Sequence, residues 1–470
     1  MLVSFFGAGN LHYLLYGYAK TRLADNARIV CAFLLLAPQI LSTIKNDKTM
    51  KKLLFIFMLF SAFSLAGCDD ENLGIDDTND NTQTQDPDNN NQDSDNDGND
   101  VNSSDNEMFP DPIFRAYVME NFDIDGDGII SEEEAEEVTY INVSISYSTP
   151  DNEKIASLEG IQHFVNLTEL FCDCNRLTTL DLSHNTALET LLCYYNQLTE
   201  LDITQNSAMT DLFCDNNELT TLDVTQNPAL TYLSCGSNKL TTLDVTQNPA
   251  LTTLFCEFNQ LTTLNVTQNP ALTSLSCYSN QLTALDITKN PALTRFTCAS
   301  NPLMTLDVTK NPAITYLDCH ENQLTALDVT KNNALTTLVC DYNNLTALDV
   351  TENSALSELS CNSNRLTTLD VTQNLQLKLL LCSTNELTEL DLSQNSVLGW
   401  LSCFSNRLTT LDLSQTSLGN SASLNQLCCS PMNGSGLETL YLKTGAEIPC
   451  IYPERDDEYV PANTRILFKD

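Results

Sequence analysis

An acidic segment of twelve residues, 123–134, has the residue types and spacing needed to bind a calcium ion. Gly128 at the sixth position permits a sharp turn, and Ile130 at the eighth position is apolar, as such loops require. The oxygen ligands would come from Asp123, Asp125, Asp127, the Ile129 carbonyl, Ser131 and Glu134, which closes the shell with both carboxylate oxygens. The pattern therefore predicts a Ca²⁺ site.

Two helices would position this loop, one over residues 109–122 and a shorter one over 132–138, which makes an EF-hand. Sensor EF-hands work in pairs, but the other acidic run, Asp93 to Gly98, has Ser104 where a closing Glu is needed. We therefore expect a structural role for the loop. Residues 108–154 would be a calcium-stabilised cap that covers the first turn of the repeats that follow.

Twelve repeats of 21 residues run from Leu167 to Leu418 and read L-x-x-L-x-C-x-x-N-x-L-T-x-L-D-V-T-x-N-x-A. We number the positions of each unit from 1 at its first residue, so Leu167 and Leu188 both stand at position 1. The two halves of the unit repeat each other: L-x-x-L-x-C-x-x-N is followed by L-x-x-L-D-V-x-x-N. Apolar residues at positions 1, 4, 6, 11, 14 and 16 would point inward, and each asparagine could bridge neighbouring turns.

This unit resembles the bacterial leucine-rich repeats with nested periodicity, the IRREKO type, and more distantly the internalins. The resemblance covers residues 155–442 and implies a repeat solenoid that is mostly β: a leucine-rich repeat rod. Because both halves carry the same pattern, we expect short parallel strands in both halves of each turn, after a small helical cap. Residues 443–470 would form a C-terminal cap.

Cysteine occupies position 6 in every unit, from Cys172 to Cys403. An inward position of this kind suits a small buried hydrophobic side chain. Neighbouring turns would bring the α-carbons within disulfide range, but parallel Cα–Cβ bonds would hold the β-carbons as far apart as the α-carbons. We expect reduced thiols, and a disulfide ladder is the alternative.

The variable positions indicate where a ligand would bind, because positions 12 to 19 hardly change whereas 3, 5, 7 and 8 carry most of the variety. The aromatic residues of these variable positions are Phe171, Tyr194, Tyr195, Phe213, Tyr232, Phe255, Phe258, Tyr278, Tyr316, Tyr342, Trp400 and Phe404. Carboxylates accompany them at Glu169, Asp173, Asp215, Glu257, Glu321 and Asp341. An exposed aromatic stripe is typical of an interaction site, and the alternative is that the rings only pack on one another.

Position 15 is Asp in eleven units, with Asn265 as the exception, and forms an acidic row on the opposite half. We interpret this row as solvated side chains; an array of bound cations is the alternative.

The N-terminal part resembles a bacterial lipoprotein. Residues 50–67 have the basic start, apolar run and small residues of a secretory signal, and Cys68 follows directly. The resemblance implies lipidation at Cys68, and Asp69 to Glu71 resemble an acidic tag for export to the outer face of the outer membrane. Residues 1–49 would be an upstream mis-start, and the acidic, lysine-free segment 68–107 a disordered tether.

The net charge of −40 argues against nucleic-acid binding. The four histidines lie far apart without a catalytic partner motif, so we expect no enzyme. The sequence favours a lipid-anchored, surface-exposed outer-membrane protein, a monomer that binds a protein on a host or neighbouring cell, as adhesins do. A glycan-binding lipoprotein for nutrient capture is the alternative, and a surface-layer component is a third.

Overall fold

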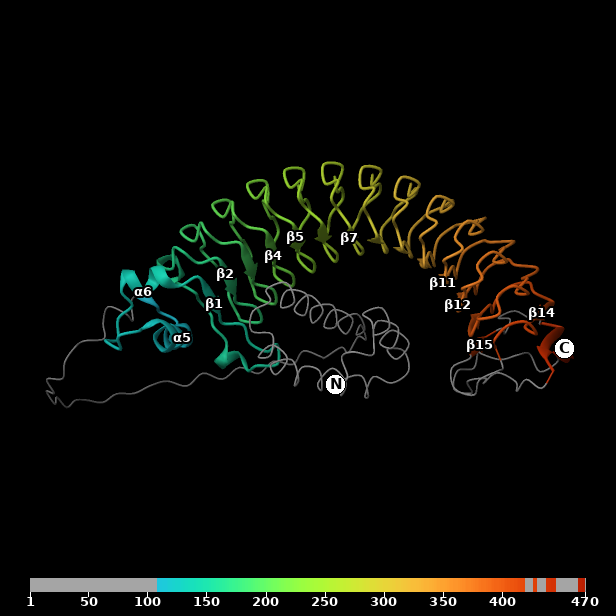
Figure 1. The fold of residues 1–470 in the computed structure, drawn as a ribbon, viewed down its shortest axis with the longest axis horizontal. Coiled ribbons are helices and arrows are strands. Elements are labelled where there is room, and N and C mark those ends of the chain that lie inside the picture. Colours follow the sequence, from blue (N-terminus) through green and yellow to red (C-terminus); the bar gives the residue numbers. More distant parts are fainter. Residues whose placement is uncertain (1–107, 419–425, 429–436, 445–463, 470) are drawn as a thin grey trace, which may run out of the picture. The chain divides into compact units, whose positions relative to one another are not determined.

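A computed structural model of the chain describes residues 108–418, 426–428, 437–444 and 464–469 (Figure 1). The predicted mis-start, signal peptide, lipidation site at Cys68 and tether lie outside the described residues. No helix among the described residues is long and apolar enough to cross a membrane.

A parallel β-solenoid makes up most of the described chain, which confirms the predicted fold class. One strand from each turn joins a sheet of 14 strands, in the order β1 to β13 and then β15. Each strand pairs with the same position of the next unit, as Leu212 does with Leu233, so the register repeats without a shift.

The first strand of this 14-stranded sheet, β1, spans Tyr140–Asn142, and its last strand, β15, spans Gln426–Cys428. The twelve units supply the strands between them: β2 (Glu169–Phe171), β3 (Thr190–Leu192), β4 (Asp211–Phe213), β5 (Tyr232–Ser234), β6 (Thr253–Phe255), β7 (Ser274–Ser276), β8 (Arg295–Thr297), β9 (Tyr316–Asp318), β10 (Thr337–Val339), β11 (Glu358–Ser360), β12 (Leu379–Leu381) and β13 (Trp400–Ser402).

The core is a continuous column of the apolar residues at positions 1, 4, 6, 11, 14 and 16. In one unit these are Leu188, Leu191, Cys193, Leu198, Leu201 and Ile203, all buried. Burial of this surface in every turn supplies the main stabilisation of the solenoid, because the hydrophobic contribution scales with apolar area.

Two rows of asparagine join the turns, as the sequence predicts. Asn196, at position 9, donates to the carbonyls of Cys172 and Cys193 at 3.0 Å and accepts from the Leu177 N–H at 2.9 Å. Asn206, at position 19, donates to the carbonyls of Leu182 and Asn185, but its buried Oδ1 has no hydrogen-bond partner. The first row therefore satisfies its side chains more completely than the second.

The prediction of a strand in both halves of each turn is wrong for the second half. Among the described residues this half forms a strand only at β14 (Thr410–Asp412), which pairs with β16 (Thr439–Lys443), and β16 pairs with β17 (Arg465–Lys469). In the other units a local turn occupies positions 15 to 17: Asp202 Oδ1 accepts from both the N–H and the hydroxyl of Thr204, at 2.9 and 2.7 Å. The Ser414 N–H donates to Asp412 Oδ1 in the same way directly after β14, so this turn is compatible with a strand, and β14 differs in having the neighbouring strand β16 to pair with.

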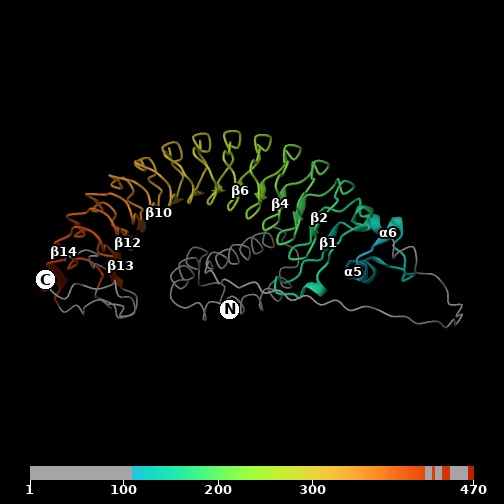
Figure 2. The same ribbon diagram turned by 180° about the vertical axis from the view of Figure 1, so that it is seen from behind.

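The predicted rod is curved. Figures 1 and 2 show the 14-stranded sheet on the inner side of the arc that the repeats form, with the second half-turns on the outer side. Strands that hydrogen-bond directly lie about 4.8 Å apart. On the outer side the bridge runs partly through asparagine side chains, which allows wider spacing.

The helical cap has two helices close to those predicted, α5 (Pro112–Phe122) and α6 (Glu132–Glu137). Asp111 caps α5 by accepting from Ile113 and Phe114, and also accepts from the Ala156 N–H at 2.8 Å. Phe109, Phe114 and Val118 belong to the same hydrophobic cluster as the repeats. Two short 3₁₀ helices, Asp151–Glu153 and Ile161–His163, lead into the first unit.

Candidate functional site

The variable residues lie on one surface, which we call the inner face and define as positions 3, 5, 7 and 8 of the units. In each strand the central residue, position 4, points into the core, whereas positions 3 and 5 point away from it, as Thr253 and Phe255 do around Leu254. Because neighbouring units pair in register, residues at one position form a row across the sheet.

The aromatic residues of the inner face form separate clusters. Phe213 stacks on Tyr232 with ring centroids 4.5 Å apart, and Tyr232 meets Phe255 edge-on at 5.7 Å. Other contacts join Tyr140 with Phe171, Tyr194 with Tyr195, and Phe258 with Tyr278, while Arg295 covers the Tyr316 ring. The fold thus brings the predicted residues to one surface, but partly against one another.

Exposure differs along this surface. Phe258 and Tyr342 are 47% and 63% exposed, whereas Phe213 is buried and most of the others, including Tyr232, Phe255 and Trp400, are half-buried. A ligand on the inner face would therefore touch Phe258 and Tyr342 with little rearrangement.

Position 8 adopts a left-handed backbone in every unit, a feature that the sequence did not reveal. The φ values lie between 50° and 61°, although no residue at this position is glycine. A left-handed φ costs a bulky side chain more than it costs Asn or Gly. Ser occupies the position in five units, so Tyr195, Phe258 and Tyr342 depart from what the backbone favours.

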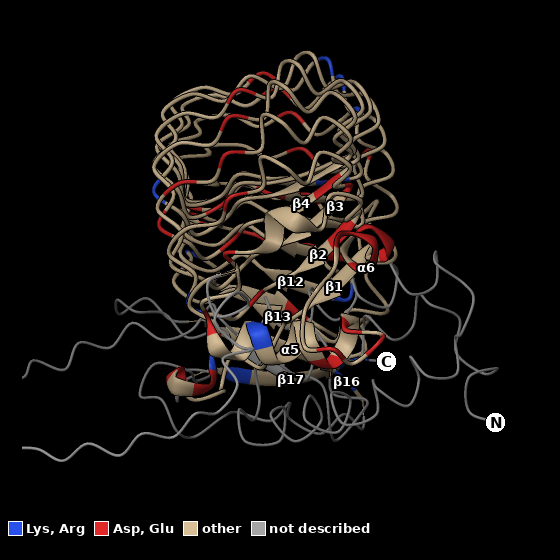
Figure 3. Cartoon of the chain, turned by 90° about the vertical axis from the view of Figure 1, so that its left-hand side faces the viewer, with Lys and Arg blue, Asp and Glu red and all other residues tan. Residues whose placement is uncertain are grey.

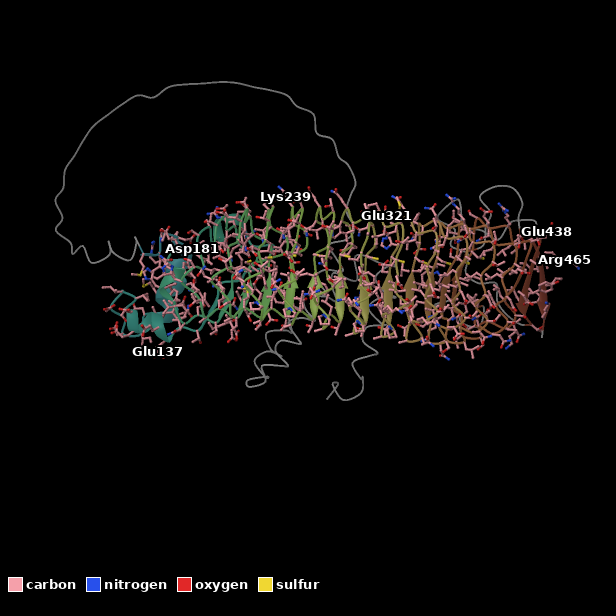
Figure 4. All side chains as sticks on the ribbon, turned by 90° about the horizontal axis from the view of Figure 1, so that it is seen from above. Glu137, Asp181, Lys239, Glu321, Glu438 and Arg465 are labelled. Atoms are coloured by element: carbon pink, nitrogen blue, oxygen red, sulfur yellow. The ribbon has the colours of Figure 1, made fainter. Side chains whose placement is uncertain are left out.

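Asp and Glu, red in Figure 3, occur along the described chain more often than Lys and Arg, which are blue. Lys239 forms an ion pair with Glu218 beside the inner face, on the edge where Glu321 also lies (Figure 4). The acidic row at position 15 is exposed, and hydrogen bonds from Thr204 lower the pKa of Asp202, as happens at other members of the row. These local donors stabilise the ionised form of the side chains in the row.

Several carboxylates of the inner face are buried, which was not predicted. Asp173, Asp215, Glu257 and Asp341 are each less than 9% exposed. Burial raises the pKa of Asp215 to about 6 and that of Glu257 to about 7. The same effect raises the pKa of Asp341, which accepts from the Ser360 hydroxyl at 2.7 Å. Asp215 and Glu257 are therefore poised to change charge near neutral pH.

A histidine also belongs to this face. His320 Nδ1 lies 2.7 Å from Asp318 Oδ1, and this hydrogen bond raises the histidine pKa. Asp318 is at position 5 and His320 at position 7 of the same unit, and this spacing of two residues places both side chains on the same side.

The predicted calcium loop brings three of its carboxylates together. Ligand atoms of Asp123, Asp125 and Glu134 all lie within 4.8 Å of one another. Asp127 is outside this group, and its Oδ1 accepts from the Ile129 N–H at 2.8 Å. Gly128 has a φ of 82°, the left-handed conformation that the turn requires.

Helix α6 positions the closing glutamate. Ser131 is the N-cap, and its N–H donates to Glu134 Oε2 at 2.9 Å, while Ile124 N–H donates to Oε1 at 2.7 Å. These two bonds lower the pKa of Glu134, so it is ionised at neutral pH. A converging set of carboxylates fits a hard cation such as Ca²⁺.

The cysteines of position 6, together with Cys174, are free and buried in the described residues. Burial raises the pKa of thiols such as Cys214 and Cys235 well above the ordinary value, so they remain protonated. Cys214 Sγ donates to the Ser234 carbonyl at 3.5 Å, so this buried thiol has a hydrogen-bond partner within the core.

Comparison with known proteins identifies close structural relatives. No protein-family model matches the chain. A segment of 81 residues, 17% of this chain, is 41% identical to Internalin J of Listeria monocytogenes serotype 4b (strain F2365) but spans only 8% of that protein's length.

Two solved structures extend the match. The functional domain of InlJ from Listeria monocytogenes, described as including a cysteine ladder, is 38% identical with a TM-score of 0.64, and the match covers 72% of this chain and 75% of that one. An internalin, inlF, from Listeria monocytogenes str. 4b F2365 has the same fold at 20% identity and a TM-score of 0.56, over 70% of this chain and 92% of that one.

Proposed function

Since the chain belongs to the internalin-like leucine-rich repeat proteins, we propose that it is a surface adhesin whose inner face recognises a protein on a host or neighbouring cell. The observation that carries this proposal is the gathering of nearly all sequence variety on one continuous sheet, while the rest of each unit is uniform. Variation confined to one face is what a repeat protein needs in order to recognise one partner.

A protein partner fits this face better than a glycan. The inner face runs across all twelve units, and aromatic clusters alternate along it with carboxylates such as Glu169 and Glu321. Protein interfaces are extended and enriched in Tyr, Trp and Phe, whereas a short glycan would need only one such cluster. Glycan capture by one aromatic cluster is the second candidate.

The repeats themselves provide matched variants for the test. Phe258→Ser and Tyr342→Ser place at position 8 the residue that five other units have there, so the fold is kept. If these exposed rings anchor the partner, the double variant should bind it about tenfold more weakly or worse. Val397→Ala removes an exposed apolar side chain outside the inner face and is the control.

The measurement has two steps. Surface proteins of host and neighbouring cells are captured with the full chain, and the captured protein is then purified and its affinity measured for each variant. A glycan array is run in parallel. Saturable binding to oligosaccharides with no protein ligand would favour the glycan over the protein partner. If the double variant binds the partner as tightly as the wild type does, Phe258 and Tyr342 are not part of the binding site.

The anchoring of the chain at Cys68 is also proposed, on the sequence of residues 50–68 alone. Metabolic labelling with a radioactive fatty acid should label the wild type and leave Cys68→Ser unlabelled. Proteolysis of intact cells then tests exposure, because a chain protected from added protease is not on the outer surface.

We further propose that the loop 123–134 binds Ca²⁺. Asp123, Asp125 and Glu134 would hold the ion, which would join α5 to α6 and stiffen the cap. Support comes from the convergence of three carboxylates and the lowered pKa of Glu134.

A further inference from the structure

Three neighbouring turns bring two buried carboxyl groups together over a glycine. Asp215 and Glu257 occupy position 7 of the turns that contain β4 and β6, and Gly236 occupies the same position in the turn between them. Gly236 is the only glycine at position 7 in the twelve units.

Lack of space explains this glycine. A β-carbon on Gly236 would lie 3.2 Å from Asp215 Oδ1 and 3.3 Å from both Cγ and Cδ of Glu257, closer than ordinary contacts. The two acidic side chains therefore lean over the same residue from opposite sides. Gly236 has no positive φ, so the glycine serves close approach rather than an unusual backbone conformation.

The two carboxyl groups are unequally satisfied. Asp215 Oδ1 accepts from the Ser234 hydroxyl at 2.6 Å and from the Gly236 N–H at 2.9 Å. Glu257 is only 6% exposed, and its Oε2 has no hydrogen-bond partner. No ion pair within the described part of the chain includes either residue. A buried ionised carboxylate is costly without a positive partner.

The neighbouring rings indicate what kind of cation would complete the pair. Phe213, Tyr232 and Phe255 form one aromatic cluster on the same three turns. These rings stand at positions 3 and 5 of their units, and the acidic pair stands at position 7. Aromatic rings attract organic cations and cover aliphatic chains. A calcium ion, in contrast, requires six to eight oxygen ligands, more than two carboxyl groups and one hydroxyl supply.

We propose that Asp215 and Glu257, with this aromatic cluster beside them, form a subsite for the ammonium group of a lysine side chain on the partner protein. A compact ammonium with three N–H donors suits two carboxyl groups on different turns, whereas the planar guanidinium of arginine suits one carboxylate through both oxygens. Glu257 turns outward to admit the ammonium, and the lysine stem lies on the rings. This inference rests on the proposed function in taking the partner to be a protein.

The test uses the full chain and a small probe, so that it does not depend on finding the partner. Nα-acetyl-lysine methylamide is titrated at about pH 8, where both carboxyl groups are ionised, and binding is followed by ligand-observed NMR. We expect saturable binding that weakens about tenfold or more in Glu257→Gln and in Asp215→Asn. The same probe acetylated on Nε should not bind.

Two further variants separate a built site from general attraction to an acidic chain. Gly236→Ala keeps every charge but displaces both carboxyl groups, and position 7 of another unit holds Ala299, so the fold accepts alanine there. This variant should also lose the probe. Glu200→Gln removes one exposed charge outside the inner face and should bind the probe as the wild type does.

The proposal is overturned if Glu257→Gln or Gly236→Ala binds the probe as well as the wild type, or if nothing saturates at up to about 50 mM probe. The proposal is also overturned if Ca²⁺ displaces the probe from the wild type and Ca²⁺ binding is lost in Asp215→Asn and Glu257→Gln. The site would then be a metal site. Probe binding without any protein partner would contradict the proposed function and leave the subsite standing.

Discussion

At the scale of single residues, asparagine decides how one turn is joined to the next. Asn259 at position 9 accepts from the Leu240 N–H at 2.9 Å and donates to the carbonyls of Cys235 and Cys256. Asn269 at position 19 of the same unit donates to the carbonyls of Val245 and Asn248, but its Oδ1 has no partner. Both side chains are buried, but they differ in which backbone groups their loss would leave unpaired.

Asn259→Ala should therefore cost more stability than Asn269→Ala. The first leaves a buried N–H as well as carbonyls unpaired, and the second leaves only carbonyls unpaired. We expect a difference of about 1–2 kcal/mol in the free energy of unfolding, measured by urea denaturation of both variants. Equal losses would mean that the N–H bond to Oδ1 contributes nothing.

The acidic pair of the inner face makes stability depend on pH. Because burial raises the pKa of Asp215 to about 6 and of Glu257 to about 7, the folded chain holds these protons more tightly than the unfolded chain. The stabilisation is fully present below about pH 4, the ordinary pKa of carboxyl groups, and is lost as the pH rises through about 6 to 7. The tyrosine and cysteine side chains that interact electrostatically with the pair have raised pKa values and stay neutral there: Tyr194, Tyr195, Tyr232, Tyr278, Cys193, Cys214, Cys235, Cys256 and Cys277.

Glu257→Gln should remove most of this loss, since glutamine is neutral at every pH. Between about pH 5 and pH 8, the wild type should lose on the order of 2 kcal/mol of stability relative to this variant. Urea denaturation across the pH range measures the difference, and Glu200→Gln is the exposed control. Parallel curves for wild type and Glu257→Gln would show that the pair does not titrate in this range.

At the scale of elements, the cap depends on how one loop joins two short helices. The loop between α5 and α6 is held by hydrogen bonds to its own carboxylates, such as Gly126 N–H to Asp123 at 2.8 Å. Helix α6 has only six residues, too few to be stable alone, so its position depends on the capping box of Ser131 and Glu134 and on packing of Ala135.

Calcium should raise the melting temperature, and a chelator should lower it, because an ion that binds only the folded loop stabilises it by mass action. We expect half-saturation at roughly 0.1 to 1 mM, as in extracellular modules. Glu134→Gln should abolish the response, whereas Glu133→Gln, a neighbour outside the converging group, should keep it. Differential scanning calorimetry with and without EDTA gives the result, and an unchanged melting temperature in EDTA contradicts the calcium proposal.

At the scale of the whole molecule, each turn is stabilised by its contacts with the turns on either side. Each unit contacts only its neighbours, and the hydrophobic cluster extends from Phe109 in the cap to Leu442 in β16. In such a chain, local openings can begin anywhere along the solenoid. The row of cysteines along the core is a natural reporter of these openings.

In the native chain the thirteen described thiols, among the eighteen cysteines of the sequence, should therefore react slowly with Ellman's reagent, because they are buried and burial raises the pKa of thiols such as Cys214. In denaturant without a reducing agent, all thirteen should react. Few reactive thiols under those conditions would establish the disulfide ladder that was the alternative. The same experiment after treatment with a reducing agent is the control for complete unfolding.

The sequence by itself determined the solenoid, its unit length, the buried position 6 and the two asparagine rows, because each depends on a local period of apolar or amide side chains. It also marked positions 3, 5, 7 and 8 as variable, and it placed α5 and α6 to within a few residues. These features follow from which side of an extended chain a residue faces, a property that successive residues fix among themselves.

Only the tertiary structure decided the rest. Apart from β14, the described second half-turns form no strand although both halves share one pattern, and asparagine side chains such as Asn206 join these turns. The burial of Glu257 and its meeting with Asp215 over Gly236 depend on what the turns before and after supply. Residues 42 apart in the chain become neighbours across one turn, and a single unit's sequence does not contain that contact.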